Sequence, residues 1–359
     1  MALSEASASA AAPPRPDAAA LDPPRAYGVP LARVRVRTEP EDFCVEECLG
    51  FAPAGTGAHI LLQVRKREAN TAWVARELAR LGGCRPFEVG YAGLKDRRAV
   101  ALQWFTVPRR SRTPEQWRGV SGEGFEVLEA HGHTRKLPRG ALEGNRFHIL
   151  ARGEPPEAQA LKARLEHIGA HGVPNYFGPQ RFGREGGNLA HLPADPGALR
   201  PAERGFVLSA VRSLLFNAVL AERVRTGRWC ELEAGDRAQL DGRGSHFAVE
   251  APDATLHERA ARLEIHPSGP LWGAGELDCA GAVRELEADI ARGYPAACAL
   301  LEAAGLRQER RSLRLAVRDL EARIEPDGVR LQFRLTRGAY ATAVLREVFV
   351  LEDYEPSST

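Results

Sequence analysis

The chain has 359 residues, with 49 Lys and Arg against 47 Asp and Glu, so its formal net charge is only +2. At roughly 100 to 200 residues per domain, this length predicts two domains that each bury a core. The charge total neither supports nor excludes a nucleic-acid partner. No stretch approaches the roughly 18 apolar residues needed to cross a bilayer, so no membrane-spanning helix is expected.

The N-terminal residues 1–26 are rich in Ala, Ser and Pro and lack both a basic start and a Leu- or Val-rich stretch. They are typical of a disordered tail and not of a secretion signal. The six cysteines are scattered, with no CxxC pair and no histidine at zinc-finger spacing, and HExxH is absent. We therefore expect reduced thiols, a cytoplasmic location and no metal.

In the first half of the chain, a short apolar run over 58–64 predicts a strand, and the spacing of apolar residues over 70–81 predicts a helix. Alternating apolar residues then predict strands over 87–91 and 103–107. The segment 93–98 between them is therefore expected to be a tight loop at the end of a sheet.

The second half begins with an irregular segment, 172–188, that is dense in Gly, Pro, Asn and aromatic residues. Before it we expect strands over 125–128 and 147–151 and a helix with Leu161, Leu165 and Ile168 on one face. After it we expect a helix over 207–219, a hairpin turn at 240–242, a helix over 282–292, a strand over 329–335 and a helix over 341–349. Because no βαβ rhythm is present, an α+β fold with a largely antiparallel sheet is predicted.

The most informative loop contains Asp96 between Lys95 and Arg97, with Arg98 following. Neighbouring positive charge could keep this carboxylate ionised and present it to an anionic ligand. A polar turn with Asp96 as a cap or surface charge explains the same residues. Local chemistry leaves both interpretations open. The phosphate-binding patterns GxxxxGK[ST] and GxGxxG are absent from this loop.

Aromatic residues alternate with Asn, Gln and Arg over 175–183, an arrangement that could stack on RNA bases and grip phosphates. An irregular connection packed into a core explains it equally well. Asn145 with Phe147, and the segment 337–342, could belong to a base pocket or to a turn and a core. Basic runs such as 65–67 and 310–314 are typical of solvated faces.

Together, in this order, the motifs resemble the TruD family of tRNA pseudouridine synthases. The resemblance covers nearly all of the chain after the tail. Its segments are 39–43, 91–98 with 103–105, 135–137 with 144–147, 173–183 and 337–347. The GLKD loop and the NYFGPQRFG stretch are long enough to be specific. The family implies a catalytic domain with a mixed, mainly antiparallel sheet in two parts, 27–170 and 318–359, interrupted by an inserted α+β TRUD domain over 171–317.

The resemblance implies that Asp96 is the catalytic aspartate of an isomerase that converts uridine 13 of tRNA to pseudouridine without a cofactor. A carboxylate suits this reaction because it can attack C1′ or C6, or remove a sugar proton. Arg37 stands where bacterial relatives carry a lysine and is expected to pair with Asp96.

The same resemblance assigns the substrate pocket. Asn145 would bond the uracil edge, Phe43 and Tyr340 would line or support the pocket, and Phe147 is a further stacking candidate. Relatives often carry Phe in place of Tyr340, so its added hydroxyl must find a partner.

We expect tRNA as the partner of a monomer, with no membrane and no protein partner. The RNA would lie in a basic cleft around Lys95, Arg97, Arg98, Arg181 and Arg184, with the last two as candidates for phosphate contact. Two other functions remain open. One is a tRNA-binding or RNA-chaperone protein without catalysis, and the other is a carboxylate-based glycosidase, which needs a second catalytic acid.

Overall fold

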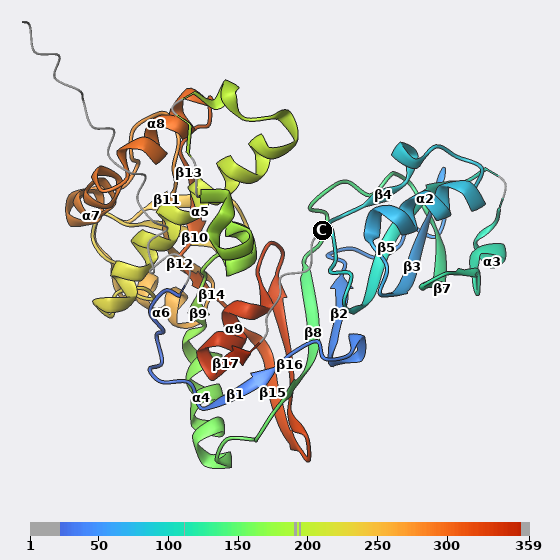
Figure 1. Ribbon diagram of the computed structural model, residues 1–359, viewed down its shortest axis with the longest axis horizontal. Helices are drawn as coiled ribbons and strands as arrows, with labels where there is room; N and C mark the ends of the chain where they lie inside the picture. Colours follow the sequence, from blue (N-terminus) through green and yellow to red (C-terminus); the bar gives the residue numbers. More distant parts are fainter. Residues whose placement is uncertain (1–21, 111, 190–191, 194, 353–359) are drawn as a thin grey trace, which may run out of the picture.

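The computed structural model describes residues 22–110, 112–189, 192–193 and 195–352 (Figure 1). Of the expected tail, residues 1–21 lie outside this description. Arg25 and Ala26 are described, and both bind helix α9 (Ala341–Val348). Arg25 Nε donates to the carbonyl of Arg346 at 3.0 Å, and the backbone N–H of Ala26 donates to the Glu347 carboxylate at 2.9 Å.

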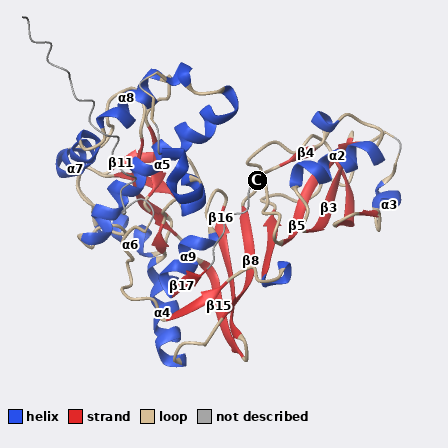
Figure 2. Cartoon of the chain, in the orientation of Figure 1, coloured by secondary structure: helices blue, strands red, loops and turns tan. Residues whose placement is uncertain are grey.

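A large mixed sheet runs through the molecule in the order β15–β16–β8–β2–β5–β3–β7–β6, and β1, β17 and β4 add to it (Figure 2). Only the β1–β17 and β2–β5 pairs among these are parallel. The α+β fold with a mixed, mainly antiparallel sheet is therefore confirmed. The strands are β1 (Ala32–Arg35), β2 (Phe43–Cys48), β3 (His59–Arg67), β4 (Gly90–Tyr91), β5 (Val100–Pro108), β6 (Ser121–Gly122), β7 (Phe125–His133), β8 (Gly144–Arg152), β15 (Arg318–Glu325), β16 (Gly328–Thr336) and β17 (Phe349–Glu352).

Helices cover this sheet in two places. Helix α2 packs on β3, β5 and β7 through Val74 and Leu78, and α4 and α9 pack near β8 and β16 (Figure 1). The α-helices are α2 (Thr71–Leu81), α3 (Pro114–Trp117), α4 (Ala158–His171), α5 (Pro201–Arg225), α6 (Ala254–Ala261), α7 (Gly281–Arg292), α8 (Pro295–Ala303) and α9. Short 3₁₀ helices lie at Pro40–Asp42, Pro86–Glu88, Pro179–Phe182, Arg184–Leu189 and Pro196–Ala198.

A second body surrounds α5 and contains a four-stranded antiparallel sheet ordered β11–β10–β12–β13. Its strands are β10 (Arg237–Leu240), β11 (His246–Ala248), β12 (Ile265–Leu271) and β13 (Glu309–Ser312). By length and composition α5 could cross a membrane over Glu203–Arg225, contrary to the sequence expectation, but 67% of its apolar window is buried inside the protein. Burial on this scale is typical of a core helix.

The chain enters and leaves the second body through two adjacent strands, β9 (Val173–Pro174) and β14 (Arg314–Leu315), which pair antiparallel. Gly172 precedes β9 with φ 75°, and a Cβ there would lie 2.4 Å from the carbonyl oxygen of Leu315. Only glycine satisfies both the left-handed backbone and this close approach. The exact domain limits proposed from the sequence stay predictions.

Most of the predicted elements are present, with longer strands than expected. The main error lies at 86–88, where alternating apolar residues predicted a strand and the structure has a 3₁₀ helix. Pro86 at the first helical position and the Glu88 carboxylate, which accepts from the Arg85 N–H at 2.9 Å, favour this turn. Side-chain capping therefore outweighed the apolar alternation.

Candidate active site

Residues 93–98 form a loop between β4 and β5 that is held by the polar side chains beneath it. Gln103 Nε2 donates to the Gly93 carbonyl at 2.8 Å, and the Lys95 N–H donates to Thr71 Oγ1 at 3.1 Å. The Thr71 hydroxyl in turn donates to Gln103 Oε1 at 3.0 Å. Because Thr71 and Gln103 are both buried, the loop is fixed to the sheet and to the start of α2.

Lys66 of β3 holds the backbone of the same loop. Its side chain is fully buried, and Nζ donates to the carbonyls of Ala69, Lys95 and Asp96 at 2.9, 3.4 and 2.8 Å. Burial lowers the pKa of Lys66 to about 8, although the nearby Asp96 carboxylate opposes that shift. The expectation that the 65–67 run is a solvated face is wrong for Lys66, since alternate residues of a strand point to opposite faces.

The carboxylate of Asp96 pairs with Arg37, as expected from the resemblance. Arg37 Nη2 lies 2.5 Å from Asp96 Oδ2, and its guanidinium also lies over the Phe43 ring at 4.1 Å. The Arg37 side chain is 8% exposed, whereas that of Asp96 is 32% exposed. Arg37 has φ 64°, an uncommon backbone conformation for a residue other than glycine. The ion pair and the ring contact thus hold a strained residue beside a carboxylate that solvent still reaches.

The two basic neighbours of Asp96 in the sequence have other partners. Lys95 Nζ pairs with Glu47 at 2.6 Å, and Arg97 Nε donates to the Glu68 carbonyl at 3.3 Å. Glu47 is buried and also accepts the Trp104 N–H at 2.8 Å. The proposal that Lys95 supplies positive charge to a basic cleft is therefore wrong, because a buried carboxylate neutralises it.

Asn145 lies on the face of β8 that also carries Phe147. It stands opposite Glu47 of β2 and Leu335 of β16 in the sheet. Its Oδ1 is buried and has no hydrogen-bond partner among the described residues. A buried acceptor left in this state costs free energy, on the order of 1 to 3 kcal/mol, unless a ligand satisfies it. Asn145 is therefore suited to accept a hydrogen bond from a bound molecule.

Phe43 and Phe147 are placed together, but both belong to the core. They are 4% and 6% exposed, and their ring centroids lie 6.0 Å apart in an edge-to-face arrangement. The Phe147 ring also contacts Phe333 at 5.4 Å. These aromatic residues support the Arg37 side and the Asn145 side of the site from beneath.

Tyr340, directly before α9, contacts the 175–183 segment. Its hydroxyl accepts a hydrogen bond from Arg181 Nη2, and its ring meets Phe177 at a centroid distance of 6.4 Å. Arg181 Nη1 also donates to Ser209 at 3.0 Å. The added hydroxyl thus has a partner, and Arg181 is engaged with protein groups. The side chain of Arg184 lies outside the described part of the chain.

Arg311 is a member of this group that the sequence did not single out. Its guanidinium lies over Phe177 at 4.3 Å and donates to Asn175 Oδ1 at 2.7 Å. Burial, followed by the nearby Arg181, lowers the pKa of Arg311 to about 10, and Tyr340 opposes the shift. The sequence did show Arg311 as part of a basic run over 310–314. The arginines of that run, however, pack inside the second body. Arg310, for example, pairs with the buried Glu287 at 2.8 Å.

We expect Tyr340→Phe to have a small effect, because it removes one hydroxyl and leaves the ring against Phe177. The hydrogen bond comes from the charged Arg181 guanidinium in a partly buried position and contributes about 1.5 kcal/mol, so the melting temperature should fall by only a few degrees. Thermal unfolding and kcat measured on the same preparations check this. A loss of more than tenfold in kcat would instead make the hydroxyl part of the reaction chemistry.

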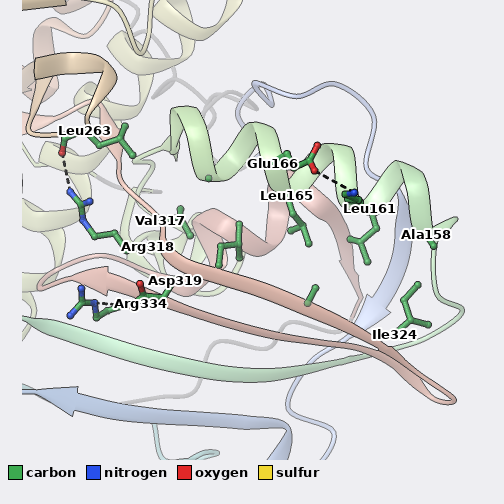
Figure 3. A pocket seen from close by; sticks show the side chains of 14 residues that line it. Ala158, Leu161, Leu165, Glu166, Leu263, Val317, Arg318, Asp319, Ile324 and Arg334 are labelled. Atoms are coloured by element: carbon green, nitrogen blue, oxygen red, sulfur yellow. Dashed lines mark hydrogen bonds and ion pairs between the residues drawn. The ribbon is translucent and has the colours of Figure 1, made fainter. Parts of the chain in front are cut away.

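Elsewhere, a cavity of about 940 Å³ separates α4 from β15 (Figure 3). Leu161 and Leu165 of α4 line it opposite Val317 and Ile324. It lies away from the 93–98 loop. Within the described ranges, no group of three or more His, Cys, Asp or Glu side chains could hold a metal ion.

Comparison with known proteins identifies the family of the chain. The profile of the family described as tRNA pseudouridine synthase D (TruD) matches residues 26–192 and 198–348. A tRNA pseudouridine synthase D of Nitrosococcus oceani is 46% identical over 332 residues, which is 90% of this chain and 93% of the relative. One from Methylococcus capsulatus is 46% identical over 344 residues, covering 93% and 95%.

A solved TruD structure from Methanosarcina mazei superposes with a TM-score of 0.69 at 19% identity, covering 92% of this chain and 96% of that one. At this identity the likeness shows the fold, and the fold is that of a pseudouridine synthase. With the family profile and the close relatives, it follows that the chain belongs to the TruD family.

Proposed function

We propose that this protein isomerises uridine 13 of tRNA to pseudouridine, with Asp96 as the reacting carboxylate and without a cofactor. The observation that carries the proposal is the Arg37–Asp96 ion pair on a loop that buried side chains fix in place. Membership of the TruD family supports the reaction class. Arg37 holds the Asp96 carboxylate in a fixed position beside the Phe43 ring, and a fixed carboxylate serves either nucleophilic attack or proton removal.

The reaction needs no external reactant. The C1′–N1 bond of uridine breaks, the uracil turns, and a C1′–C5 bond forms, while C5 loses one proton and N1 gains one. Asp96 can begin this sequence by attacking C1′ or C6 or by removing a sugar proton. Its 32% exposure leaves it accessible to a nucleotide that has been turned out of its stack.

In this proposal the open Oδ1 of Asn145 accepts the N3–H of the extruded uracil. Extruding a base costs a few kcal/mol, so the pocket must return hydrogen bonds and stacking. Phe43 and Phe147 lie too deep to stack directly in the present arrangement, and they support Arg37 and Asn145 instead. Tyr340 contacts Arg181 and Phe177, which belong to the second body, and supports the pocket from there.

The test is an assay of purified protein with unmodified tRNA transcript in EDTA, followed by mapping of pseudouridine. Conversion at position 13 supports the proposal. Conversion at another position would overturn the assignment of the target, and binding without conversion would favour the tRNA-binding alternative. Release of free uracil would favour a glycosidase. A cytoplasmic location and a monomeric state stay predictions.

Replacement of Asn145 tests the base contact. Asn145→Ala is expected to lower kcat/KM by roughly 10- to 100-fold, which corresponds to one hydrogen bond to a bound base. The dissociation constant for whole tRNA should change less than threefold, since most of the affinity comes from the phosphate backbone. Single-turnover kinetics and filter binding measure the two quantities. Equal losses in both would assign Asn145 to the fold instead of the base.

A further inference from the structure

A second cavity, of about 560 Å³, lies where β8 begins and β16 ends. We call it the strand-end pocket. Five arginines and only two carboxylates line it; the arginines are Arg135, Arg243, Arg318, Arg334 and Arg337. Of the carboxylates, Asp241 is already occupied, because it accepts from Arg318 at 2.8 Å and lies 3.1 Å from His266 Nε2. The pocket therefore carries a positive charge that its own acids do not balance.

Arg318 pairs with Asp241 and Arg334 with Asp319. The other three, Arg135, Arg243 and Arg337, have no carboxylate partner within the described part of the chain. Arg337 Nη1 donates to the Gly140 carbonyl at 2.7 Å, which fixes its direction without neutralising it. Arg135 and Arg243 are exposed. Arginine forks of this kind match the oxygens of a phosphate group.

The pocket is built from both bodies of the protein. Arg243 and Asp241 belong to the turn between β10 and β11, and a Cβ on Gly242 of that turn would lie 3.3 Å from Thr336 of β16. The bonds of Asp241 to Arg318 and His266 hold this turn in place beside β15. The arginines thus converge through a structured contact between the two bodies.

An aromatic ring completes the lining. Phe51 is 37% exposed, and it stacks on His133 with centroids 5.4 Å apart. Exposed aromatic rings beside arginines are the combination that binds single-stranded nucleic acid, since bases stack on the ring while the cations contact phosphates. The lining therefore favours a nucleotide over a simple inorganic anion.

This pocket adjoins the place proposed for the target uridine, since Leu335 lines it, but it extends to the other face of the sheet. Asn145 and Leu335 are opposite one another in the sheet, and so are Gly144 and Thr336. Because successive residues of a strand point to opposite faces, Thr336 and Arg334 lie on the face away from Asn145. Both strands end here, so an RNA strand can pass over their ends from one face to the other.

We propose that the strand-end pocket binds one nucleotide of the tRNA outside the target uridine. Arg135, Arg243 and Arg337 contact its phosphates, and Phe51 stacks on its base. The proposal rests on the tRNA substrate of the proposed function. It adds a second contact point that would fix how the tRNA is oriented across the two bodies.

The test measures binding of labelled, unmodified tRNA by anisotropy in an Asp96→Asn background, so that no turnover is involved. In the double variant Arg135→Ala with Arg243→Ala, the dissociation constant at 150 mM salt should rise about tenfold. The slope of log affinity against log salt should fall by about 1.5, as for the loss of two phosphate contacts. Phe51→Ala should weaken binding about fivefold with an unchanged slope, because stacking is not ionic.

The matched control removes two exposed arginines elsewhere, Arg76 of α2 and Arg323 of β15, by Arg76→Ala with Arg323→Ala. It should change the dissociation constant less than twofold. Equal losses in both double variants would overturn the proposal, because they would show only a general charge effect. Pyrophosphate binding in calorimetry that the pocket variant loses, with unchanged tRNA affinity, would overturn it in favour of a small-anion site.

Failure of the proposed function is detected separately. If wild-type protein binds tRNA but leaves uridine 13 unmodified, the reaction assignment fails, while the binding comparison still decides whether the pocket contacts RNA. Thermal unfolding of each variant confirms that it is folded.

Discussion

Asp96→Asn is expected to lower kcat by about 10³-fold or more, because the amide can neither attack carbon as a carboxylate does nor accept a proton at neutral pH. The substitution keeps the size of the side chain, and Arg37 can still donate to the amide oxygen. Affinity for tRNA should therefore stay within about threefold. Single-turnover conversion of a tRNA transcript and filter binding measure the two effects.

Glu41→Gln is the matched control. Glu41 lies within the Arg37–Phe43 segment, but it is exposed and pairs with Arg67 at the surface. We expect its kcat to remain within twofold of wild type. Near-normal turnover by Asp96→Asn would remove Asp96 from the chemistry, and a large loss in Glu41→Gln would mean that any carboxylate change in this region disturbs the site.

The second large effect is expected from Lys66→Met, which keeps an unbranched side chain one atom shorter and removes three hydrogen bonds, two to the carbonyls of Lys95 and Asp96 in the loop and one to that of Ala69. We expect kcat to fall about 100-fold with little change in KM, because the carboxylate would be misplaced by a fraction of an ångström while the RNA contacts remain. Lys66 therefore acts as a positioning residue for the Asp96 loop. Lys162→Met, at an exposed position on α4, should leave both constants unchanged.

The pH dependence separates this role from a merely structural one. With a pKa of about 8, Lys66 loses its proton in the folded protein well before it would in the unfolded chain, whose value is 10.5. A neutral amine has two N–H groups for three carbonyls, so kcat of the wild type should decline as the pH rises through about 8. Lys66→Met should lack that decline. An identical pH profile in both proteins would contradict the positioning role.

The lowered pKa of Lys66 has the opposite effect on stability: a rise in pH that lowers kcat should raise the free energy of unfolding. Between pH 8 and 10.5 the unfolded chain holds the Lys66 proton more often than the folded chain does. The free energy of unfolding therefore rises with pH across this window. Urea unfolding at several pH values should show this rise for wild type relative to Lys66→Met.

The Arg37–Asp96 pair was expected from the family resemblance, and the helix predicted over 70–81, found over Thr71–Leu81, followed from a clear apolar period and the glycine after it. The roles of the site residues stay predictions. The missed features share one cause. Whether Lys66 is solvated or buried depends on which face of β3 meets the loop, and a run of three basic residues does not contain that information. Likewise, Lys95 is adjacent to Asp96 in sequence, yet only the β2–β5 pairing determines that Glu47 becomes its partner.

Local sequence patterns also did not predict where the second body contacts the large sheet. The strand-end pocket joins residues from the β7–β8 loop, the β10–β11 turn and the end of β16. Each arginine alone is typical of a solvated surface, and tertiary contacts such as those of Gly242 with Thr336 and of Asp241 with Arg318 bring them together. Sequence periodicity identifies helices and strands well, but it does not show which of their ends lie side by side in the folded protein.

The position of β16 has a consequence for how the protein is made. In the finished sheet β8 lies between β2 and β16, so its second edge finds a partner only after residues 328–336 have left the ribosome. The segment around α5 is synthesised earlier and has its own core, so it can fold first. Until the last strands arrive, β8 presents an unpaired edge with buried apolar residues such as Ile149. Truncation before residue 328 would therefore leave an aggregation-prone chain that has the 93–98 loop and its supporting strands β3 and β5 but lacks β16 and β17.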